Sequence, residues 1–353
     1  MFDILSKTIT NIKPLDKVSM AKAKERQNVL TKPTGSLGRL EQLSILIAGI
    51  QGRPIPQIKK KAVIVMAADH GVAARGTSAY PQDVTAQMVL NFLRGGAGIN
   101  VISRQVGARV IIVDMGVTVQ PEADKRLVSR RIAAGTQDMS RGHAMTLAQV
   151  KQALETGIEI VTAEIKKGLD IVATGDMGIG NTTASSAICA IMTGKTVAEV
   201  TGRGTGLNDI QLQQKIRIIN DAIALNQPDP ANALDVLAKV GGFEIGGLAG
   251  VILGAASHRI PVVIDGFISG AAALIAAGLC PQSKDYMIAG HCSVEPGHKL
   301  LLQYLGLKPL LDLEMRLGEG TGAALAMSLA ETSVRILNEM ATFAEAGVSD
   351  KGE

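Results

Sequence analysis

Short apolar runs alternate with longer helical patterns along most of the chain. The runs are dominated by Val, Ile and Ala and occupy residues 62–68, 110–113, 171–174, 262–264 and 286–289. Between them lie segments with the period of a helix, such as residues 146–167 and 208–226. Because apolar strands separated by helices are buried on both faces, the pattern predicts an α/β fold with a parallel sheet flanked by helices.

Both ends of the chain carry helical patterns without a strand pattern. Residues 15–30 and 40–50 form two such segments, and residues 323–346 form one long amphipathic segment. We expect these segments to meet as a small all-helical domain beside the sheet. The expected domains are residues 1–58 and 319–353 for the two parts of the small domain, and residues 59–318 for a large α/β domain that holds the active site.

Polar residues follow directly after the predicted strands. They are Asp69-His70-Gly71, Asp114-Met115-Gly116, Gly175-Asp176, Asp265-Gly266 and Gly290-His291. In parallel sheets, ligands bind outside the carboxyl ends of the strands. We therefore expect these residues to share one cleft.

Composition excludes several classes of function. The 353 residues include no Trp and only 2% aromatic residues, and the formal net charge is +4. Such a chain lacks the aromatic platforms on which many nucleic-acid binders stack bases. The three cysteines are widely spaced, and the five histidines show no metal-ligand spacing. We therefore expect no nucleic-acid partner, no metal and a reducing, cytoplasmic location.

No segment has the character of a membrane span. The first residues contain no apolar signal-peptide core, and the uncharged run at residues 266–283, which no other run exceeds in length, is interrupted by glycines. This run predicts a buried helix followed by a loop, so we expect no membrane association.

One acidic residue, Glu319, stands between glycines in the segment LGEGTG at residues 317–322. Glycines on both sides permit backbone conformations closed to other residues and allow a ligand to approach closely. A carboxylate held in such a loop is placed to remove a proton from a bound molecule. The alternative is a solvated acid at the start of the following helix.

Two glycine-rich turns precede helical patterns. Residues 175–183 follow a predicted strand, and residues 202–206 precede the helical segment that contains Lys215. Backbone N–H groups at a helix start bind phosphate or ribose oxygens, so the turns and the lysine fit a monophosphate site. The alternatives are a turn capped by Asn181 or Thr182, and a Lys215 that lies on the surface.

Six motifs in order along the chain identify a family resemblance. They are KPTGSLGRLE at residues 32–41, ADHGV at 68–72, GDMGIGNTT at 175–183, KVGGF at 239–243, DGF at 265–267 and LGEGTG at 317–322. With them the chain resembles the nicotinate-nucleotide–dimethylbenzimidazole phosphoribosyltransferase family over about residues 20–345. The resemblance implies a glycosyltransferase of cobalamin lower-ligand synthesis, a Rossmann-like sheet, a small helical domain and a homodimer.

The resemblance also implies roles for individual residues, and no cofactor. Glu319 would be the general base, and Asp176 a second carboxylate that reaches the active site. Burial would raise the Glu319 pKa by more than a helix N-terminus lowers it. The residues that would hold nicotinate mononucleotide are Gly178, Asn181, Thr182, Gly204, Thr205, Lys215, Asp265 and Ser293, with Lys215 near the phosphate. The residues that would line the acceptor pocket are Tyr80, Met88, Met177 and Leu317.

Three residues depart from the family pattern. Asp176 stands where Glu is common, Met88 where many members have Gln, and Tyr80 where smaller residues are frequent. A thioether cannot donate a hydrogen bond to a heterocyclic nitrogen as an amide can. Dimethylbenzimidazole is therefore the first acceptor to consider, and another benzimidazole, a purine or a phenol such as p-cresol stays open.

Two other functions stay open. A non-catalytic paralogue would bind the nucleotide or form a heterodimer with an active paralogue, but it would have no need of the intact Glu319 loop. A nicotinamide-dependent dehydrogenase rests only on the strand–turn–helix pattern, and the chain lacks the strict Gly-x-Gly-x-x-Gly fingerprint at that turn. An assay of nicotinate release from nicotinate mononucleotide in the presence of acceptor bases distinguishes the transferase from these two functions.

Overall fold

A six-stranded sheet forms the centre of the protein in the computed structural model, which describes residues 3–120 and 124–349. The strands are β1 (Lys61–Ala68), β2 (Ala108–Gly116), β3 (Leu127–Ser129), β4 (Ile171–Met177), β5 (Val262–Ile264) and β6 (Met287–Ala289). Their order is β3-β2-β1-β4-β5-β6, and the neighbours are parallel, which confirms the predicted α/β fold. The strand order changes direction between β1 and β4, and ligands bind at such a point in open parallel sheets.

The edge strand β3 is the one strand of the described sheet that the apolar pattern does not predict. It has three residues, pairs only with β2, and is partly exposed. Because an edge strand is not covered on both faces, it needs no continuous apolar run, and its sequence carries no strong signal.

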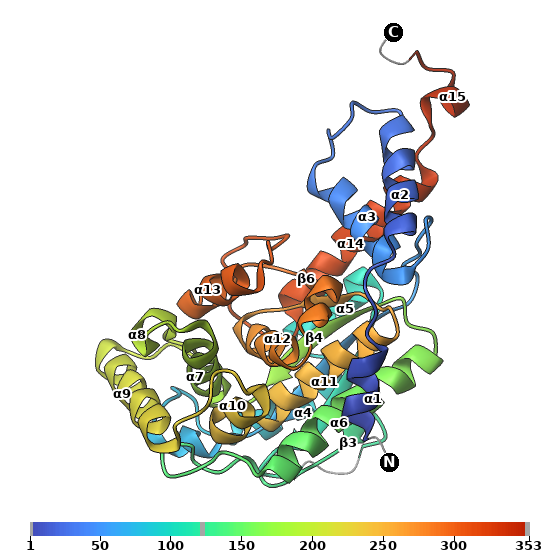
Figure 1. Cartoon of the computed structure of the whole chain (residues 1–353). Helices are drawn as coiled ribbons and strands as arrows, with labels where there is room; N and C mark the ends of the chain where they lie inside the picture. The colour runs from blue at the N-terminus through green and yellow to red at the C-terminus, as the bar shows by residue number, and fades with distance from the viewer. Residues whose placement is uncertain (1–2, 121–123, 350–353) are drawn as a thin grey trace.

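Helices cover both faces of the sheet (Figure 1). The even-numbered residues of β1 pack into a layer that includes α6, α11 and α12, and its odd-numbered residues pack into a layer that includes α4, α5 and α14. The helices of the first layer are α6 (Leu147–Lys166), α7 (Asn181–Thr193), α10 (Ala233–Val240), α11 (Phe243–Ser257) and α12 (Phe267–Leu279). Those of the second layer are α4 (Val84–Arg94), α5 (Gly98–Val106) and α14 (Thr321–Glu339). All eight residues of β1 are buried, as expected for a central strand.

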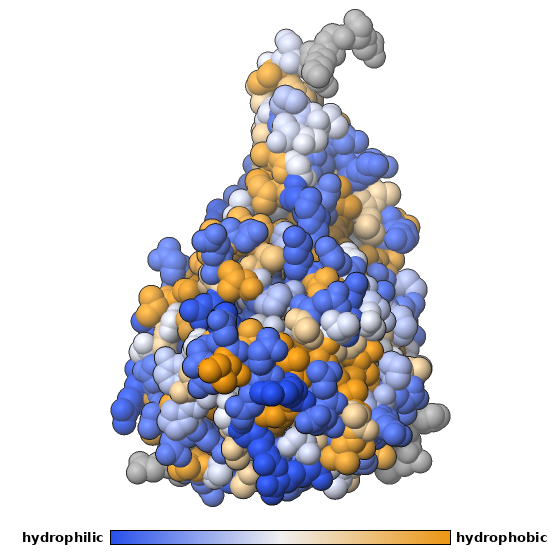
Figure 2. Space-filling view, turned by 90° about the vertical axis from the view of Figure 1, so that its left-hand side faces the viewer, coloured by the Kyte–Doolittle hydropathy of each residue, from blue (hydrophilic) through white to orange (hydrophobic). Residues whose placement is uncertain are grey.

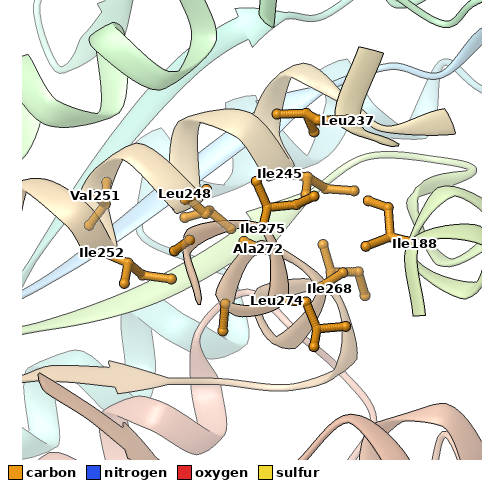
Figure 3. Packing of buried hydrophobic residues seen from close by; sticks show 14 of the residues in the cluster. Ile188, Leu237, Ile245, Leu248, Val251, Ile252, Ile268, Ala272, Leu274 and Ile275 are labelled. Atoms are coloured by element: carbon orange, nitrogen blue, oxygen red, sulfur yellow. The ribbon is translucent and has the colours of Figure 1, made fainter. Parts of the chain in front are cut away.

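Small and branched side chains allow close packing in the first layer. Figure 3 shows Leu248 and Ile252 of α11 beside Ala272 and Ile275 of α12. A Cβ added at Gly157 of α6 would lie only 1.9 Å from a backbone oxygen of α11. The two helices therefore touch through their backbones, which explains a core rich in Ala and Gly and poor in aromatic residues.

Helices from both ends of the chain lie side by side and project from the body of the protein (Figure 1). α2 (Lys17–Val29) and α3 (Arg39–Gln51) pack against each other and against α14 through Ala23, Ala48 and Leu337. The first helix, α1 (Ile4–Asn11), lies instead against α6 and α11, beside the sheet.

The last helical segment is interrupted, although the pattern predicts one helix over residues 323–346. α14 ends at Glu339, and α15 (Phe343–Ala346) begins after Thr342, whose side chain caps it. After α14 the backbone N–H of Thr31 donates to the Ala341 carbonyl, and the Arg26 side chain donates to the Leu337 carbonyl in the last turn of α14. These contacts with α2 and the residues after it replace helical hydrogen bonds at the break.

The remaining described elements surround the carboxyl edge of the sheet or lie along its ends. They are the short helices η1 (Gly71–Arg75) and η2 (Pro281–Tyr286), with α8 (Val197–Val200), α9 (Asp209–Asn226) and α13 (Pro296–Leu305). Figure 2 looks onto the side of α8 and α9 and shows polar and apolar residues interspersed on a body that narrows toward α2. Within the described residues, no helix is both long and apolar enough to span a bilayer.

Candidate active site

A cavity of about 740 Å³ opens at the carboxyl ends of β4, β5 and β6. Twelve of the fourteen residues predicted to form the site line it. They are Glu319, Asp176, Gly178, Asn181, Thr182, Gly204, Thr205, Ser293, Tyr80, Met88, Met177 and Leu317. Lys215 and Asp265 lie behind this lining, each bonded to groups at its edge. The sequence patterns of five separate loops thus meet in one place.

The backbone around Glu319 adopts a conformation that side chains disfavour. Gly318, Glu319 and Gly320 have φ angles of 79°, 62° and 92°. The left-handed region costs a non-glycine residue about 1–3 kcal/mol. A Cβ added at Gly175 of β4 would lie 2.4 Å from the Glu319 carbonyl oxygen, so the strand supports the loop from below. This strained backbone directs the Glu319 carboxylate into the cavity.

Glu319 is buried, and its Oε2 accepts a hydrogen bond of 3.0 Å from the backbone N–H of Ile99 in the first turn of α5. Burial raises the pKa of Glu319, while the Ile99 N–H opposes this effect. The direction is the one expected from the sequence. The helix start that the carboxylate faces is nevertheless that of α5, more than two hundred residues away in the chain.

Asp176 lies at the end of β4, and its Oδ2 accepts a hydrogen bond of 3.0 Å from the Asn181 side chain. Its other oxygen is buried without a partner among the described residues. Burial and the nearby charges of Asp265 and Glu244 hold the pKa of Asp176 well above its usual range. The carboxyl is therefore protonated over a wider pH range than an exposed aspartate, and it can donate a hydrogen bond.

Asp265 holds the start of α14 in place. Its Oδ1 accepts from the Ala323 N–H at 2.8 Å and its Oδ2 from the Gly320 N–H at 3.2 Å. The His291 ring, which lines the cavity, lies 3.7 Å from the same carboxylate. Asp265 thus fixes the loop that carries Glu319.

Lys215, in α9, is fully buried and points toward the cavity edge. Its Nζ donates to the Thr182 hydroxyl at 2.9 Å and to the Gly202 carbonyl at 3.4 Å. Burial lowers the Lys215 pKa to about 8, and the charge of Glu295 opposes this shift. A buried cation beside the starts of α7 and the 202–206 loop forms a site suited to an anionic group.

Part of the cavity wall is apolar. It includes Val84, Met88, Met177, Ile179 and Leu317. This surface suits a flat, apolar ring better than a charged group. The Tyr80 loop forms part of the rim, and the neighbouring Ala79 N–H donates to the Thr205 hydroxyl at 3.0 Å. The loop that carries Tyr80 and the 202–206 loop are thus joined.

Several polar residues at strand ends do not line the cavity, although we expected one shared cleft. Asp114 Oδ1 accepts from the backbone N–H groups of Gly116 and Val117, and Asp69 Oδ2 accepts from that of Thr118. Asp114 thus stabilises its own turn, whereas Asp69 joins the segments that follow β1 and β2. His70 lies under the Gly178 turn.

Phe267, His291, Glu295 and Arg316 are among the lining residues to which the sequence patterns assign no role. His291 was expected at the cleft as a strand-end residue, and Arg316 is adjacent to the Glu319 loop. No local pattern distinguishes Glu295 from other acids. Within the described residues, no cluster of three or more His, Cys, Asp or Glu is arranged to hold a metal ion. A second cavity, about 530 Å³ and lined by Arg75, contains none of the predicted site residues.

Comparison with known proteins gives a consistent result. The phosphoribosyltransferase family DBI_PRT matches residues 12–348. The chain is 62% identical over 347 residues to a nicotinate-nucleotide–dimethylbenzimidazole phosphoribosyltransferase from Desulforudis audaxviator, with 98% of each chain covered. It is also 62% identical over 350 residues to the protein of the same name from Chloroflexus aggregans, with 99% of each chain covered.

A solved structure has the same fold. The crystal structure of CobT from Thermus thermophilus superposes with a TM-score of 0.92 at 45% sequence identity, covering 95% of this chain and 100% of that one. The similarity therefore extends over nearly the whole chain.

Proposed function

The chain belongs to the nicotinate-nucleotide–dimethylbenzimidazole phosphoribosyltransferase family, and we propose that it transfers the 5-phosphoribosyl group of nicotinate mononucleotide to 5,6-dimethylbenzimidazole. The products are α-ribazole phosphate and nicotinate. The observation that carries this proposal is the single cavity that joins a buried carboxylate, an apolar wall and an anion site with Lys215 behind it.

The substrate carries its own leaving group. In nicotinate mononucleotide the pyridine nitrogen is cationic, and it departs from C1′ with the bonding electron pair as a neutral ring. The new bond forms between C1′ and a nitrogen of the acceptor base. Attack from the opposite face of the ribose inverts the anomeric carbon from β to α. Holding the two flat substrates in line supplies much of the rate.

Glu319 is the general base in this proposal. As the acceptor nitrogen bonds to C1′, the acceptor becomes cationic and passes the proton of its other ring nitrogen to a base. Burial raises the Glu319 pKa, which makes the carboxylate a stronger proton acceptor near neutral pH. The Ile99 N–H keeps one carboxylate oxygen in place during this transfer. We assign Asp176, protonated and bonded to Asn181, to orienting a substrate beside it.

The phosphate lies in this proposal against the starts of α7 and the 202–206 loop, where Asn181, Thr182, Gly204 and Thr205 face the cavity. Ser293 borders the same region. Lys215 supplies the positive charge through its position behind Thr182. Asp265 acts on the nucleotide indirectly, because both of its oxygens bind the start of α14.

The acceptor lies against Tyr80, Met88, Met177 and Leu317, beside Gly178. Both methionines present thioethers, which donate no hydrogen bond to a ring nitrogen. This observation keeps a phenol, such as p-cresol, as the second candidate acceptor. A phenol would attack through oxygen and would also pass its proton to Glu319.

The proposal is tested by incubating the protein with nicotinate mononucleotide and single acceptors, and by following nicotinate release with chromatography. The panel holds dimethylbenzimidazole, benzimidazole, adenine, phenol and p-cresol. We expect dimethylbenzimidazole to give the highest kcat/KM, and a higher value for a phenol would assign the second candidate. If no acceptor in the panel leads to release of nicotinate, the transfer reaction is refuted and a non-catalytic nucleotide binder is favoured.

We also propose a homodimer, a cytoplasmic location and a small helical domain from both chain ends, as in the family that the chain resembles. The packing of α2, α3 and α14 supports the helical domain. Because α1 packs against α6 and α11 instead, we propose that this domain begins at α2. Size-exclusion chromatography with light scattering tests the homodimer. A monomer that becomes active only with a second, related chain would point to a paralogous heterodimer instead.

A further inference from the structure

Glu295 places a negative charge next to the anion site of the cavity, which Lys215, the start of α7 and the 202–206 loop form. The residue is buried and lies between β6 and α13. It stands at the N-cap position of α13, but its side chain does not cap that helix. Its Oε1 accepts instead from the backbone N–H of Gly204 at 3.0 Å. A carboxylate here repels a phosphate, so its position requires an explanation.

The chain around Glu295 is built to accommodate the carboxylate. A Cβ added at Gly202 would lie 2.1 Å from Glu295 Oε2, so a side chain at position 202 would collide with it. That oxygen is buried and has no hydrogen-bond partner among the described residues. An unpaired buried carboxylate oxygen is unfavourable unless a positive charge lies near it.

Lys215 supplies that charge. Its Nζ donates to the Gly202 carbonyl, on the residue that packs against Glu295 Oε2. Of the charged groups on the surrounding elements, Glu295 is the one that raises the pKa of Lys215 against the effect of burial. Asp209, on the same helix as Lys215, pairs with Arg203 at the surface. His298 of α13 stays neutral because burial and His291 lower its pKa to about 3.

We infer that Glu295 is a positioning residue of the phosphate site. It fixes the 202–206 loop through the Gly204 N–H, and it supplies the countercharge that keeps Lys215 cationic in its buried position before the substrate phosphate arrives. The inference rests on the proposed function, in which Lys215 serves the phosphate. Glu295 itself need not touch the substrate.

Glu295→Gln separates the two roles, because the amide oxygen can still accept from the Gly204 N–H while the charge is removed. Sulfate is a suitable probe, since it stays a dianion from pH 6 to 9. Its binding to the wild type, measured by calorimetry at constant ionic strength, should weaken as Lys215 loses its proton near pH 8. In E295Q this weakening should begin about one pH unit lower, since removing the countercharge lowers the pKa of Lys215 further.

The pH dependence distinguishes this role from a merely structural one. At pH 8.5 we expect sulfate to bind E295Q about 10-fold more weakly than the wild type. At pH 6, where Lys215 is protonated in both proteins, E295Q should bind sulfate at least as tightly, because a repulsive charge is gone. The matched control is Glu199→Gln, which removes an exposed charge on the neighbouring α8 and should keep the wild-type profile.

Lys215→Arg gives a second test that does not depend on the folding of E295Q. Arginine keeps its charge over this pH range, so the sulfate profile should become flat. An E295Q profile with the wild-type midpoint, a uniform loss at every pH, no sulfate binding to the wild type, or a pH-dependent K215R profile would each overturn the inference.

Activity separates this inference from the proposed function. In E295Q, KM for nicotinate mononucleotide should rise about 10-fold at pH 8.5, with kcat and the acceptor KM within about twofold of the wild type. A wild type that shows the sulfate profile but releases no nicotinate would refute the reaction and leave the role of Glu295 at an anion site intact. If the wild type is active and the sulfate-binding profile of E295Q is not shifted, only the positioning role of Glu295 is refuted.

Discussion

The Glu319 carboxylate and the backbone N–H of Ile99 form a hydrogen bond of 3.0 Å between residues that are 220 positions apart in the chain. The bond joins the strained loop before α14 to the first turn of α5. It fixes Oε2, while no described donor binds Oε1. One oxygen is thus held in place and the other is free to receive a proton, which is the arrangement that a general base requires.

Replacing Glu319 with Gln should reduce kcat by about 10²- to 10⁴-fold, the usual contribution of a general base. The amide keeps an oxygen for the Ile99 N–H, so the loop should hold its conformation. KM for nicotinate mononucleotide should change little, because the phosphate site is separate. Steady-state kinetics of nicotinate release measure both constants. Turnover equal to that of the wild type would eliminate Glu319 as the base.

The activity should also depend on pH through Glu319. Burial raises its pKa, so Glu319 is ionised, and able to act as a base, only above a higher pH than an exposed glutamate requires. As pH falls through that raised pKa, kcat should fall in proportion to the remaining carboxylate. A profile of log kcat against pH should show this acidic limb in the wild type. In E319Q the limb should be absent, and its persistence would assign the titration to another group.

The contact between Gly175 and the Glu319 loop predicts a strong effect of one added methyl group. In Gly175→Ala the Cβ would lie 2.4 Å from the Glu319 carbonyl oxygen, and a backbone cannot move away as a side-chain tip can. The loop should shift, and kcat should fall by about 10²-fold, as displacements near 1 Å produce. The control is Gly142→Ala, where the Cβ meets nothing within 4 Å. Equal kcat in both variants would show that the loop tolerates the displacement.

Much of the fold follows from local pattern. The run at residues 62–68 and the run at 262–264 are buried strands because their side chains are covered on both faces. The break after Glu339 does not follow, because it depends on contacts from Arg26 and Thr31, which are distant in the chain. Local periodicity alone continues the helix through it.

The site residues also divide into those that the local sequence predicts and those that depend on contacts between distant segments. Glycine-rich segments mark Asp176 at the end of β4 and Glu319 in the loop before α14, because tight turns leave a signal in the sequence. Asp114 carries the same signal, yet it binds its own turn. Glu295 carries none, since its partner Gly204 comes from a different loop. Which of several acids faces a cavity depends on long-range packing, and composition does not record it.

The raised pKa of Asp176 predicts a trade between stability and function. Its carboxyl holds a proton more tightly in the folded protein than in the unfolded chain, so stability is lost as pH rises toward the folded pKa. Asp176→Asn resembles the protonated acid and removes this cost. We expect D176N to melt at a higher temperature than the wild type at pH 8, with a smaller difference at pH 5. Its kcat should fall.

Differential scanning fluorimetry at the two pH values measures this effect, with Asp221→Asn on the exposed face of α9 as the control. The control should melt like the wild type at both. A D176N variant that is less stable than the wild type at pH 8 would contradict a raised pKa of Asp176 in the folded protein.

The buried pair of His70 and Glu244 should stabilise the floor of the site in a pH-dependent way. The His70 ring lies 2.5 Å from the Glu244 carboxylate, and both side chains are almost fully buried. Burial alone would lower the His70 pKa, but the Glu244 charge and hydrogen bond outweigh it, so the pKa is raised. The pair's contribution is therefore complete below the unfolded pKa of about 6.5 and is lost as pH rises through the folded value.

Glu244→Gln leaves the His70 ring buried without its countercharge and should cost about 3–5 kcal/mol of unfolding free energy at pH 6. The cost should shrink as pH rises through the folded His70 pKa, where the wild type has lost the same interaction. Urea unfolding followed by circular dichroism at pH 6 and at pH 9 measures both values. Glu25→Gln, on the exposed face of α2, controls for the loss of one negative charge. A cost that is equal at the two pH values would show that packing, and not the ion pair, stabilises this floor.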